Sequence, residues 1–546
     1  METVQLAATA WTLIPIALTI LCVFLTKRIL LSMSVGIISS AFMVSNFNLF
    51  ATVRTIETTL ISIFITGGAS VDLEAGVVNW GGGLFNIFSR WYFSILFFLL
   101  VLGIITSMVV ITGGAKAFVE SVSSKVKSRK GVQYLTVVTG ILLMIDDYFN
   151  AMINGKIAKT LAKDHKLTRA RAAYNVDSIA APICIIAPVS TWAVAIMGNM
   201  EIVYANVGHE GNVFVEFIRM IPYQFYVFAA IGMVLITIFF DFNMFTMKKF
   251  EDRMAKDGVD LSADETGEEL LGDAQSTKGT VWDFYVPILA LVAATVATMV
   301  ITGFQARIPE QVAAYGLIYS IMDNLSLSMS LWVGACVGLA VTLYFSGRHV
   351  KSGEVSKEQF RKAIFAGMRS MATACAILIM SWMIASLIGR LEVGTFFANV
   401  VQNAGIPAGF IPFIMFVTAA IMAFCIGTSW GTFAIVLPIA GAVSAAIDIN
   451  LLFPAMAAVL SGAVWGDHSS PISDTTILAS AGTSSKVVAH FESQFPYALV
   501  AAIITAIGFL AFGLAGNVFV GYIGLAASFA VTIVVVRFLS AKQKRA

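Results

Sequence analysis

The chain has 546 residues, of which 58% are hydrophobic and only 12% are charged, and its mean hydropathy is +0.87. Soluble domains carry about 25% charged residues, so this composition excludes a soluble protein and indicates an integral membrane protein. The net charge of +2 gives no indication of nucleic-acid binding. The five cysteines lie in apolar runs without metal-ligand spacing, so we expect neither disulfides nor a cysteine metal site.

Apolar windows predict eleven membrane crossings. Residues 51–70 are ambiguous and are interpreted as a short interfacial helix. Residues 131–154 and 408–446 end on polar, glycine-containing motifs and are interpreted as re-entrant hairpins. The predicted crossings are 8–26, 29–50, 91–113, 174–199, 220–240, 281–303, 325–346, 366–389, 450–482, 495–513 and 515–537.

The basic residues orient this layout. With the N-terminus outside, the segments predicted to be cytoplasmic hold 28 of the 34 Lys and Arg residues, as the positive-inside rule requires. The first apolar run has no basic residue before it, which argues against a cleaved signal peptide. We therefore expect a multi-pass protein of the cell (inner) membrane, with its C-terminus in the cytoplasm.

The layout predicts an all-α polytopic membrane protein with two inverted repeats, each holding a re-entrant hairpin and a discontinuous helix. Each half has an odd number of crossings, so the second half would run upside down. A cytoplasmic linker from Asp241 to Thr280 separates the halves, and its later part, which includes Asp257 and Asp273, is acidic and expected to be mobile. The predicted domains are 1–240, with hairpin 131–154; the linker 241–280; 281–513, with hairpin 408–446; and 514–546, an extra C-terminal helix and tail.

Polar motifs interrupt the predicted hairpins and helices at matching places. The first hairpin reaches Asp146-Asp147-Tyr148-Phe149-Asn150, and Asp177-Ser178 follows with Pro182. The second hairpin reaches Gly427-Thr428-Ser429, and Asp467-His468-Ser469 follows with Pro471. Proline cannot donate to the carbonyl four residues back, so each helix should break and free a carbonyl near its aspartate. Carboxylates, hydroxyls and carbonyls are the ligands that hard cations such as Na⁺ prefer.

Simpler roles are open for each of these residues. Asp177 can be a helix N-cap, and Asp146 or Asp147 can cap the hairpin turn or pair with Lys156. The hydroxyls of Thr428 and Ser429 can bond back to their own helix. His468 can orient Asp467 rather than carry protons. Capping alone does not explain four polar motifs at matching places in two halves.

These motifs, with Gly466-Asp467-His468-Ser469-Ser470-Pro471 as the most specific, resemble the NhaC family of sodium/proton antiporters within the ion-transporter superfamily. The likeness covers roughly residues 80–515. It implies inverted repeats, a transport domain that moves against a scaffold, and often a homodimer. Similar proteins also carry carboxylates and amino acids, so the transported solute stays open.

The leading hypothesis is Na⁺/H⁺ exchange, because a buried carboxylate can hold either a proton or Na⁺ but not both. Asp177 and Asp467 would compete for the two ions, with Ser178 and Thr428 as further Na⁺ ligands and Asp146 or Asp147 as a proton relay. No cofactor is expected besides Na⁺ and H⁺. The candidate ion- and substrate-binding residues are Asp146, Asp147, Asn150, Asp177, Ser178, Ser190, Thr428, Ser429, Thr432, Asp467, His468, Ser469, Asp474 and Thr475.

The nearest alternative is an ion-coupled carrier of a small organic acid or amino acid, since two broken helices and two hairpin tips leave room for such a solute. An intramembrane protease is disfavoured because Val464-Trp465-Gly466-Asp467 lacks the first glycine of a Gly-x-Gly-Asp motif. An ion channel is disfavoured because nothing in one chain forms a symmetric ring of carbonyls. We expect small ions and the lipid bilayer as partners, with an organic solute as the alternative, and no nucleic acid and no enzymatic activity.

Overall fold

The computed structural model describes residues 6–26, 28–64, 91–123, 128–264 and 276–543, together with Val4, Val126 and two short strands. Within these residues ten helical segments are long and apolar enough to cross a membrane, and α2 with α3 forms an eleventh candidate that is bent by 119°. The predicted class, an all-α polytopic membrane protein with about eleven crossings, is confirmed. Strands β1 (Ser70–Asp72) and β2 (Val77–Asn79) pair antiparallel, with Val71 opposite Val78.

The first half and the linker consist of these helices: η1 (Ala10–Leu13), α1 (Ile14–Thr26), α2 (Ile29–Val44), α3 (Leu49–Phe64), α4 (Trp91–Ile111), α5 (Gly114–Ser123), α6 (Arg129–Leu142), α7 (Asp147–Asp164), α8 (Arg169–Cys184), α9 (Thr191–Val207), α10 (Val213–Met220), η3 (Ile221–Tyr223), α11 (Phe225–Phe240) and α12 (Phe245–Asp257).

The remainder of the chain consists of α13 (Trp282–Gln305), α14 (Pro309–Tyr315), α15 (Leu317–Asp323), α16 (Leu327–Lys351), α17 (Lys357–Arg390), α18 (Val393–Asn403), η4 (Ala408–Phe410), α19 (Ile411–Ile426), α20 (Ser429–Ile447), η5 (Ile449–Leu451), α21 (Leu452–His468), α22 (Asp474–Thr483), α23 (Val487–Ala515) and α24 (Val518–Gln543).

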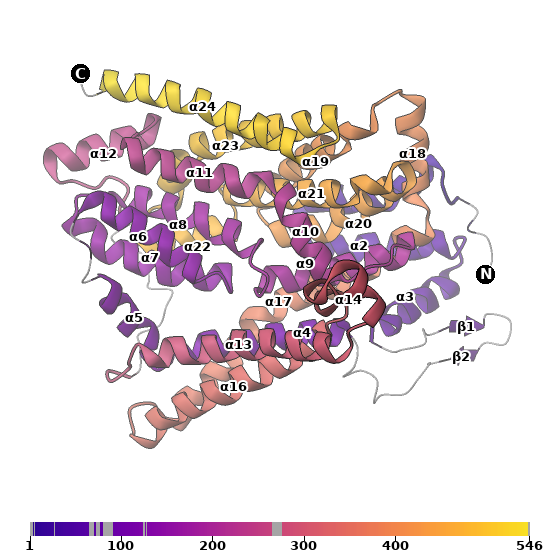
Figure 1. Cartoon of the computed structure of the whole chain (residues 1–546), viewed down its shortest axis with the longest axis horizontal. Coiled ribbons are helices and arrows are strands. Elements are labelled where there is room, and N and C mark those ends of the chain that lie inside the picture. Colours follow the sequence, from indigo (N-terminus) through magenta and orange to yellow (C-terminus); the bar gives the residue numbers. More distant parts are fainter. Residues whose placement is uncertain are drawn as a thin grey trace.

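Each half contains a helical hairpin followed by a broken helix. In the first half, α6 and α7 form the hairpin and α8 and α9 form the broken helix; in the second half, α19 and α20 precede α21 and α22. Figure 1 shows α8 and α22 at one end of the molecule, with α9 and α21 towards the other. The two broken helices therefore run in opposite directions, as an inverted repeat requires. The domain boundaries stay a prediction.

The predicted break within the crossing 174–199 is confirmed, but its predicted position at Pro182 is wrong, because Pro182 lies inside α8. The helix starts at Arg169, ends at Cys184 and resumes at Thr191. Pro188 has no N–H to continue α8. The Ser190 hydroxyl accepts from Ala193 N at 3.0 Å and so starts a new helix there. The break, residues 185–190, thus follows from Pro188 and Ser190, a few residues after the predicted position.

Residues 51–70 do form a helix, α3, up to Phe64. Residues 65–69 lie outside the described part of the chain. The bend of 119° between α2 and α3 separates α3 from the preceding crossing. The position of α3 at the membrane interface stays a prediction.

Glycines bring α19 and α21 together. A Cβ atom on Gly462 would lie 2.3 Å from the Phe416 carbonyl oxygen, and one on Gly466 would lie 2.4 Å from the Ala420 carbonyl oxygen. These glycines are four residues apart on one face of α21, the small-residue spacing that lets helix backbones touch in membranes. The contact places Asp467, the next residue, beside the tip of the second hairpin.

The later, acidic part of the linker was expected to be mobile, and for residues 258–264 this expectation is wrong. Asp260 accepts from Arg169 N at 2.7 Å, and the Ser262 hydroxyl accepts from Ala170 N at 3.0 Å. Lys486 N, at the start of α23, donates to the Ser262 carbonyl at 2.8 Å. Residues 258–264 therefore cap α8 and join it to the turn between α22 and α23. Residues 265–275 lie outside the described part of the chain.

Candidate functional site

Asp467 lies at the end of α21 and faces the tip of the second hairpin. Its Oδ2 accepts from the backbone N–H of Ser429 at 2.8 Å and from the Ser429 hydroxyl at 2.6 Å. Its Oδ1 accepts from the Ser473 hydroxyl. Asp467 is 2% exposed and Ser429 is fully buried. The carboxylate therefore takes the place of an N-cap for α20, where the partial positive charge of a helix start favours an anion.

The break after Asp467 is closed by its own residues. The Ser473 hydroxyl caps α22 by accepting from the backbone N–H of Thr475 at 3.1 Å and of Thr476 at 3.4 Å. The Thr475 hydroxyl lies 3.0 Å from that of Ser473. The prediction that the Asp467 carbonyl is free is wrong, because this carbonyl accepts from Ser470 N at 2.9 Å. Pro471 breaks the helix as predicted, but the chain then turns tightly enough to satisfy this oxygen.

The first hairpin tip is held by Asp146 and Asn150. Asp146 Oδ1 accepts from Phe149 N at 2.8 Å, so the predicted turn-capping role of one of the paired aspartates is confirmed. Asn150 donates to the Gly140 carbonyl at 2.7 Å and so ties α7 to α6. Thr191 N, at the start of α9, donates to the Ile145 carbonyl at 2.9 Å. The first break therefore lies against the first tip.

Asp147 and Asp474 bring the two halves together. The Tyr148 hydroxyl, next to Asp147, donates to Asp474 at the start of α22. Asp147 is 2% exposed, its Oδ2 has no hydrogen-bond partner, and it interacts electrostatically with both Asp467 and Asp474. The buried carboxylates of Asp147 and Asp467 and the half-buried Asp474 repel each other, and a bound cation or proton would relieve that repulsion.

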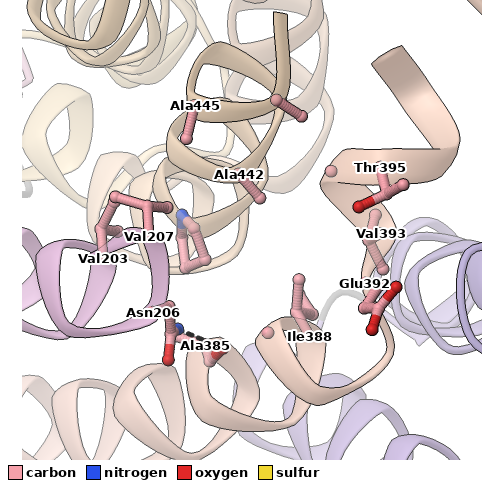
Figure 2. Close-up of a pocket in the computed structure, with 14 residues that line it drawn as sticks. Val203, Asn206, Val207, Ala385, Ile388, Glu392, Val393, Thr395, Ala442 and Ala445 are labelled. Atoms are coloured by element: carbon pink, nitrogen blue, oxygen red, sulfur yellow. Dashed lines mark hydrogen bonds between the residues drawn. The ribbon is translucent and has the colours of Figure 1, made fainter. Parts of the chain in front are cut away.

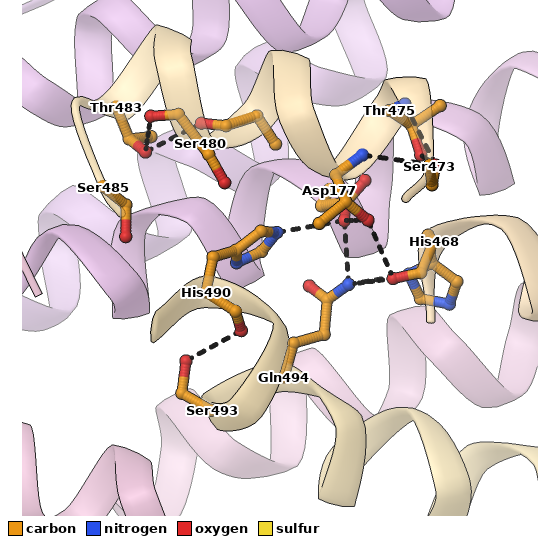
Figure 3. A network of polar contacts seen from close by, with 12 residues as sticks. Asp177, His468, Ser473, Thr475, Ser480, Thr483, Ser485, His490, Ser493 and Gln494 are labelled. Atoms are coloured by element: carbon orange, nitrogen blue, oxygen red, sulfur yellow. Dashed lines mark hydrogen bonds and ion pairs between the residues drawn. The ribbon is translucent and has the colours of Figure 1, made fainter. Parts of the chain in front are cut away.

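Asp177 has a separate set of partners, drawn in Figure 3. Its Oδ2 accepts from His490 Nε2 at 3.1 Å, from Gln494 Nε2 at 2.8 Å and, more weakly, from the Thr476 hydroxyl at 3.5 Å. Gln494 also donates to the His468 carbonyl. Asp177 lies in the middle of α8, whose N-cap is Thr168, so the simpler reading of Asp177 as an N-cap is wrong.

His468 does not orient Asp467, which corrects the simpler role considered for it. Its ring Nε2 meets the Tyr226 hydroxyl of α11, and its Nδ1 lies 3.5 Å from Gln494 Nε2. Asp467 is oriented by two serines instead. His468 therefore belongs to the group around Asp177, to which Gln494 connects it (Figure 3).

The hydroxyls of the remaining predicted residues differ in their hydrogen bonds. The Thr432 hydroxyl bonds back to the Thr428 carbonyl at 2.9 Å, and Thr428 makes no side-chain cap bond. The Ser190 hydroxyl caps α9 and donates to the Cys184 carbonyl at 2.7 Å. The hydroxyls of Ser178 and Ser469 are buried without a partner. These two hydroxyls are free to bind an ion.

The structure divides the four predicted Na⁺ ligands into two groups. Asp467 lies with Ser429 beside the Thr428 tip, whereas Asp177 and Ser178 lie on α8 beside His490. Among the described residues, no three His, Cys, Asp or Glu side chains gather as a metal-binding cluster. A transported Na⁺ ion does not need such a cluster, because hydroxyl and carbonyl oxygens suffice.

His490, Gln494 and Tyr226 contact the predicted site residues but were not predicted from the sequence. His490 and Gln494 are four residues apart, so they share one face of α23, and both are buried in a largely apolar helix. That spacing was the available signal, but the predicted crossing began at residue 495 and left both outside. Tyr148, Ser473 and Thr476 stood in the quoted motifs or beside them without an assigned role.

Known proteins with similar sequences are transporters or lack a described function. An uncharacterised protein of Haemophilus influenzae is 32% identical over 98% of this chain and 97% of its own length. A malate-2H⁺/Na⁺-lactate antiporter of Bacillus subtilis is 39% identical over 100 residues, 18% of this chain and 20% of its own. The arginine/ornithine antiporter ArcD of Halobacterium salinarum is 34% identical over 20% of this chain and 26% of its own.

Among solved structures, Neisseria gonorrhoeae MtrF aligns over 86% of this chain and 85% of its own, with a TM-score of 0.49 and 13% identity. The family model described as the Na⁺/H⁺ antiporter family matches residues 183–514, which include Asp467, the second hairpin and the whole second broken helix. This chain therefore belongs to the Na⁺/H⁺ antiporter family.

Proposed function

We propose that this secondary transporter exchanges Na⁺ for H⁺ at the carboxylates between its two broken helices. The observation that carries the proposal is the position of Asp467, whose two oxygens face the start of α20 on one side and the break before α22 on the other. Both contacts involve hydroxyls, which can turn their oxygens towards a cation or their protons towards a carboxylate. The site can therefore accept Na⁺ without moving its backbone.

A proton and Na⁺ would exclude each other at this site. Na⁺ at Asp467 would take ligands from the hydroxyls of Ser429, Ser473 and Ser469, the last of which has no partner. A proton on the carboxylate would remove the charge that holds the ion. If the site changes sides of the membrane only when it holds Na⁺ or a proton, Na⁺ is exchanged for H⁺ and no additional coupling element is needed. Asp147 is the proposed relay, because one of its oxygens is unpartnered.

The test uses the purified protein in liposomes that carry a pH gradient and an internal pH-sensitive dye. Addition of Na⁺ alone should collapse the gradient, and K⁺ at the same concentration is the control for charge and ionic strength. If Na⁺ acts only when an organic acid or amino acid is also present, the alternative function holds. If the pH gradient persists after addition of Na⁺, with or without an organic solute, the proposal of Na⁺/H⁺ exchange is overturned.

Exchange of an organic acid is the second candidate, and a buried arginine favours it. Arg171 is 1% exposed, and among the described residues it forms no ion pair with a carboxylate. It donates to Gln133 at 2.8 Å and lies over the rings of Tyr174 and Tyr497, while its Nη2 has no partner. Arginine binds carboxylates through paired N–H groups, so this position could receive an organic anion. The names of the malate/lactate and arginine/ornithine relatives agree with this candidate.

The setting proposed for this activity is the cell (inner) membrane, with the N-terminus outside and the C-terminus in the cytoplasm. Support comes from the division of Lys and Arg residues and from the termini, which lie at opposite ends of the helices in Figure 1. Na⁺ and H⁺ are the only ions proposed to be needed, without a cofactor. A second copy of the chain is a proposed partner on the basis of the family resemblance alone.

A further inference from the structure

A pocket of about 260 Å³ lies at the far end of α9 and α20, which begin at the first break and at the second hairpin tip, and beside the end of α17. Figure 2 shows it between α9, α17, α18 and α20. Its lining includes Val203 of α9, Ala385 of α17 and Pro438 of α20. It is large enough for several waters, at about 30 Å³ each. Of the described residues that line it, Glu392 alone carries a charge.

One helical turn inward from the pocket, the same three helices present oxygen atoms to each other. Asn199, Ser381 and the Ala434 carbonyl each lie four residues before the lining residue of their helix, about 6 Å along the axis. The Ser381 hydroxyl is within hydrogen-bond distance of Asn199 Oδ1 and lies 2.8 Å from the Ala434 carbonyl oxygen. Asn199 and Ser381 are fully buried. We call these three groups the oxygen layer.

Three oxygens of the oxygen layer share a single proton. The Asn199 amide N–H group donates to the Ala195 carbonyl at 3.0 Å, so its oxygen faces Ser381. Pro438 has no N–H, so no helical hydrogen bond reaches the Ala434 carbonyl from that position. A hydroxyl has one proton and can satisfy only one of the two facing oxygens at a time. The layer is therefore rich in electron pairs and poor in donors, which suits a cation with part of its water removed.

Beyond the layer, the helices continue to the Asp467 site. Trp192 and Trp430 lie next to each other, with ring centroids 5.9 Å apart, and Trp430 directly follows Ser429. On α20 the order is thus pocket, oxygen layer, aromatic pair and Asp467 ligand, over nine residues or about 14 Å. Cations also interact favourably with aromatic faces such as those of Trp192 and Trp430.

We infer that this column is the route by which a monovalent cation reaches Asp467, with the oxygen layer as an intermediate binding site and Glu392 at the entrance. The inference rests on the proposed Na⁺/H⁺ exchange. The pocket lies beside the turn after Arg390. The division of basic residues places this turn on the outer, non-cytoplasmic side of the membrane. The cation would enter from that side.

The test separates an ion ligand from a residue that only satisfies the carbonyl left by Pro438. Ser381→Ala should raise the apparent KM for Na⁺ about tenfold, and it should also lower the thermal midpoint, because it leaves buried acceptors without a donor. Pro438→Ala restores an N–H that can bond to the Ala434 carbonyl, so it should raise the KM as well, and the double variant should stay impaired. If Pro438→Ala has a normal KM and rescues Ser381→Ala, the serine is structural and the inference is wrong.

The entrance is tested with Glu392→Gln, and Glu310→Gln on α14 is the matched control, since both glutamates are exposed at the same predicted face. Glu392→Gln should raise the KM for external Na⁺ about threefold at low ionic strength, and Glu310→Gln should leave it unchanged. Equal effects of both variants would show a general surface-charge effect and would overturn the role of Glu392. If the unmodified protein does not exchange Na⁺ at all, the proposed function fails; if it exchanges Na⁺ and every variant has a normal KM, only the route fails.

Discussion

Replacement of Asp467 with Asn tests the centre of the site with little change of shape. The carboxylate accepts three hydrogen bonds, two from Ser429 and one from Ser473. The amide oxygen of Asn can keep both bonds from Ser429, and the Ser473 hydroxyl can turn to accept from the amide nitrogen. A hydrogen bond to a charged group contributes about 1.5–3 kcal/mol and a neutral one about 1 kcal/mol. We therefore expect the free energy of unfolding to fall by about 1–3 kcal/mol.

The same substitution should also weaken Na⁺ binding. Without the charge, the contact with Na⁺ loses up to about 3 kcal/mol, the upper value for a charged hydrogen bond, and each 1.4 kcal/mol is a factor of ten. The apparent Na⁺ affinity of Asp467→Asn should fall about a hundredfold, and exchange should stop because the amide cannot bind a proton in this pH range. Asn keeps the polar shape, so expression and the far-ultraviolet spectrum should be normal.

The assay combines the liposome measurement of Na⁺-driven collapse of a pH gradient with thermal denaturation in detergent at several Na⁺ concentrations. Asp257→Asn is the matched control, because Asp257 pairs with Arg253, one turn earlier on α12 and at 3.0 Å, and with no other charged group in the described part of the chain. This control should exchange Na⁺ at the normal rate. A normal rate for Asp467→Asn would refute the reasoning, since Asp467 would then only cap α20.

Three further predictions concern ion competition, the second hairpin tip and the linker. The Na⁺ dissociation constant should fall about tenfold per pH unit over the range in which a proton occupies the binding carboxylate, measured by thermal shift from pH 6 to 9 without organic solutes. Gly427→Ala should lower the thermal midpoint and exchange rate, because Gly427 has φ +77° and an added Cβ would lie 2.8 Å from the Ile472 carbonyl oxygen. Hydrogen bonds from Ser276 and then Lys278 lower the pKa of Glu354 to about 2, so this linker contact should persist at all pH values above about 4.5 and be lost as the pH falls towards 2. Limited proteolysis should detect that loss.

Each of these predictions has its own control or contrary result. A Na⁺ affinity that is flat with pH and clearly saturable would exclude a shared carboxylate that titrates in this range. Gly516→Ala is the control for backbone strain alone, since Gly516 has φ +65° and open space around it. An equal loss of exchange in both variants would contradict a specific role of the second hairpin tip. Glu354→Gln should increase cleavage near Lys278 already at pH 7, and unchanged cleavage would show that other contacts hold the linker.

The sequence by itself determined the elements of the site. Pro188 and Pro471 lie at the two helix breaks, because proline has no N–H for the helix ladder, whereas Pro182 and Pro438 lie inside α8 and α20. Gly427 ends α19 because its left-handed φ of +77° favours glycine, which has no Cβ atom to clash. Such signals act over one helical turn, so they predicted both hairpin tips and a break in each half, but the first break lies at residues 185–190 and not at Pro182.

Only the tertiary structure decided which of these elements meet. The pairs Asp177 with His490, Tyr148 with Asp474 and Tyr226 with His468 join residues more than 200 positions apart. These contacts depend on which face of each helix turns towards which neighbour. That choice is made by helix packing, for example by the close approach of α19 and α21 at Gly462 and Gly466, and no spacing within one segment reports it. The residue types of the site are therefore readable in the sequence, whereas the partner of each carboxylate follows from the fold.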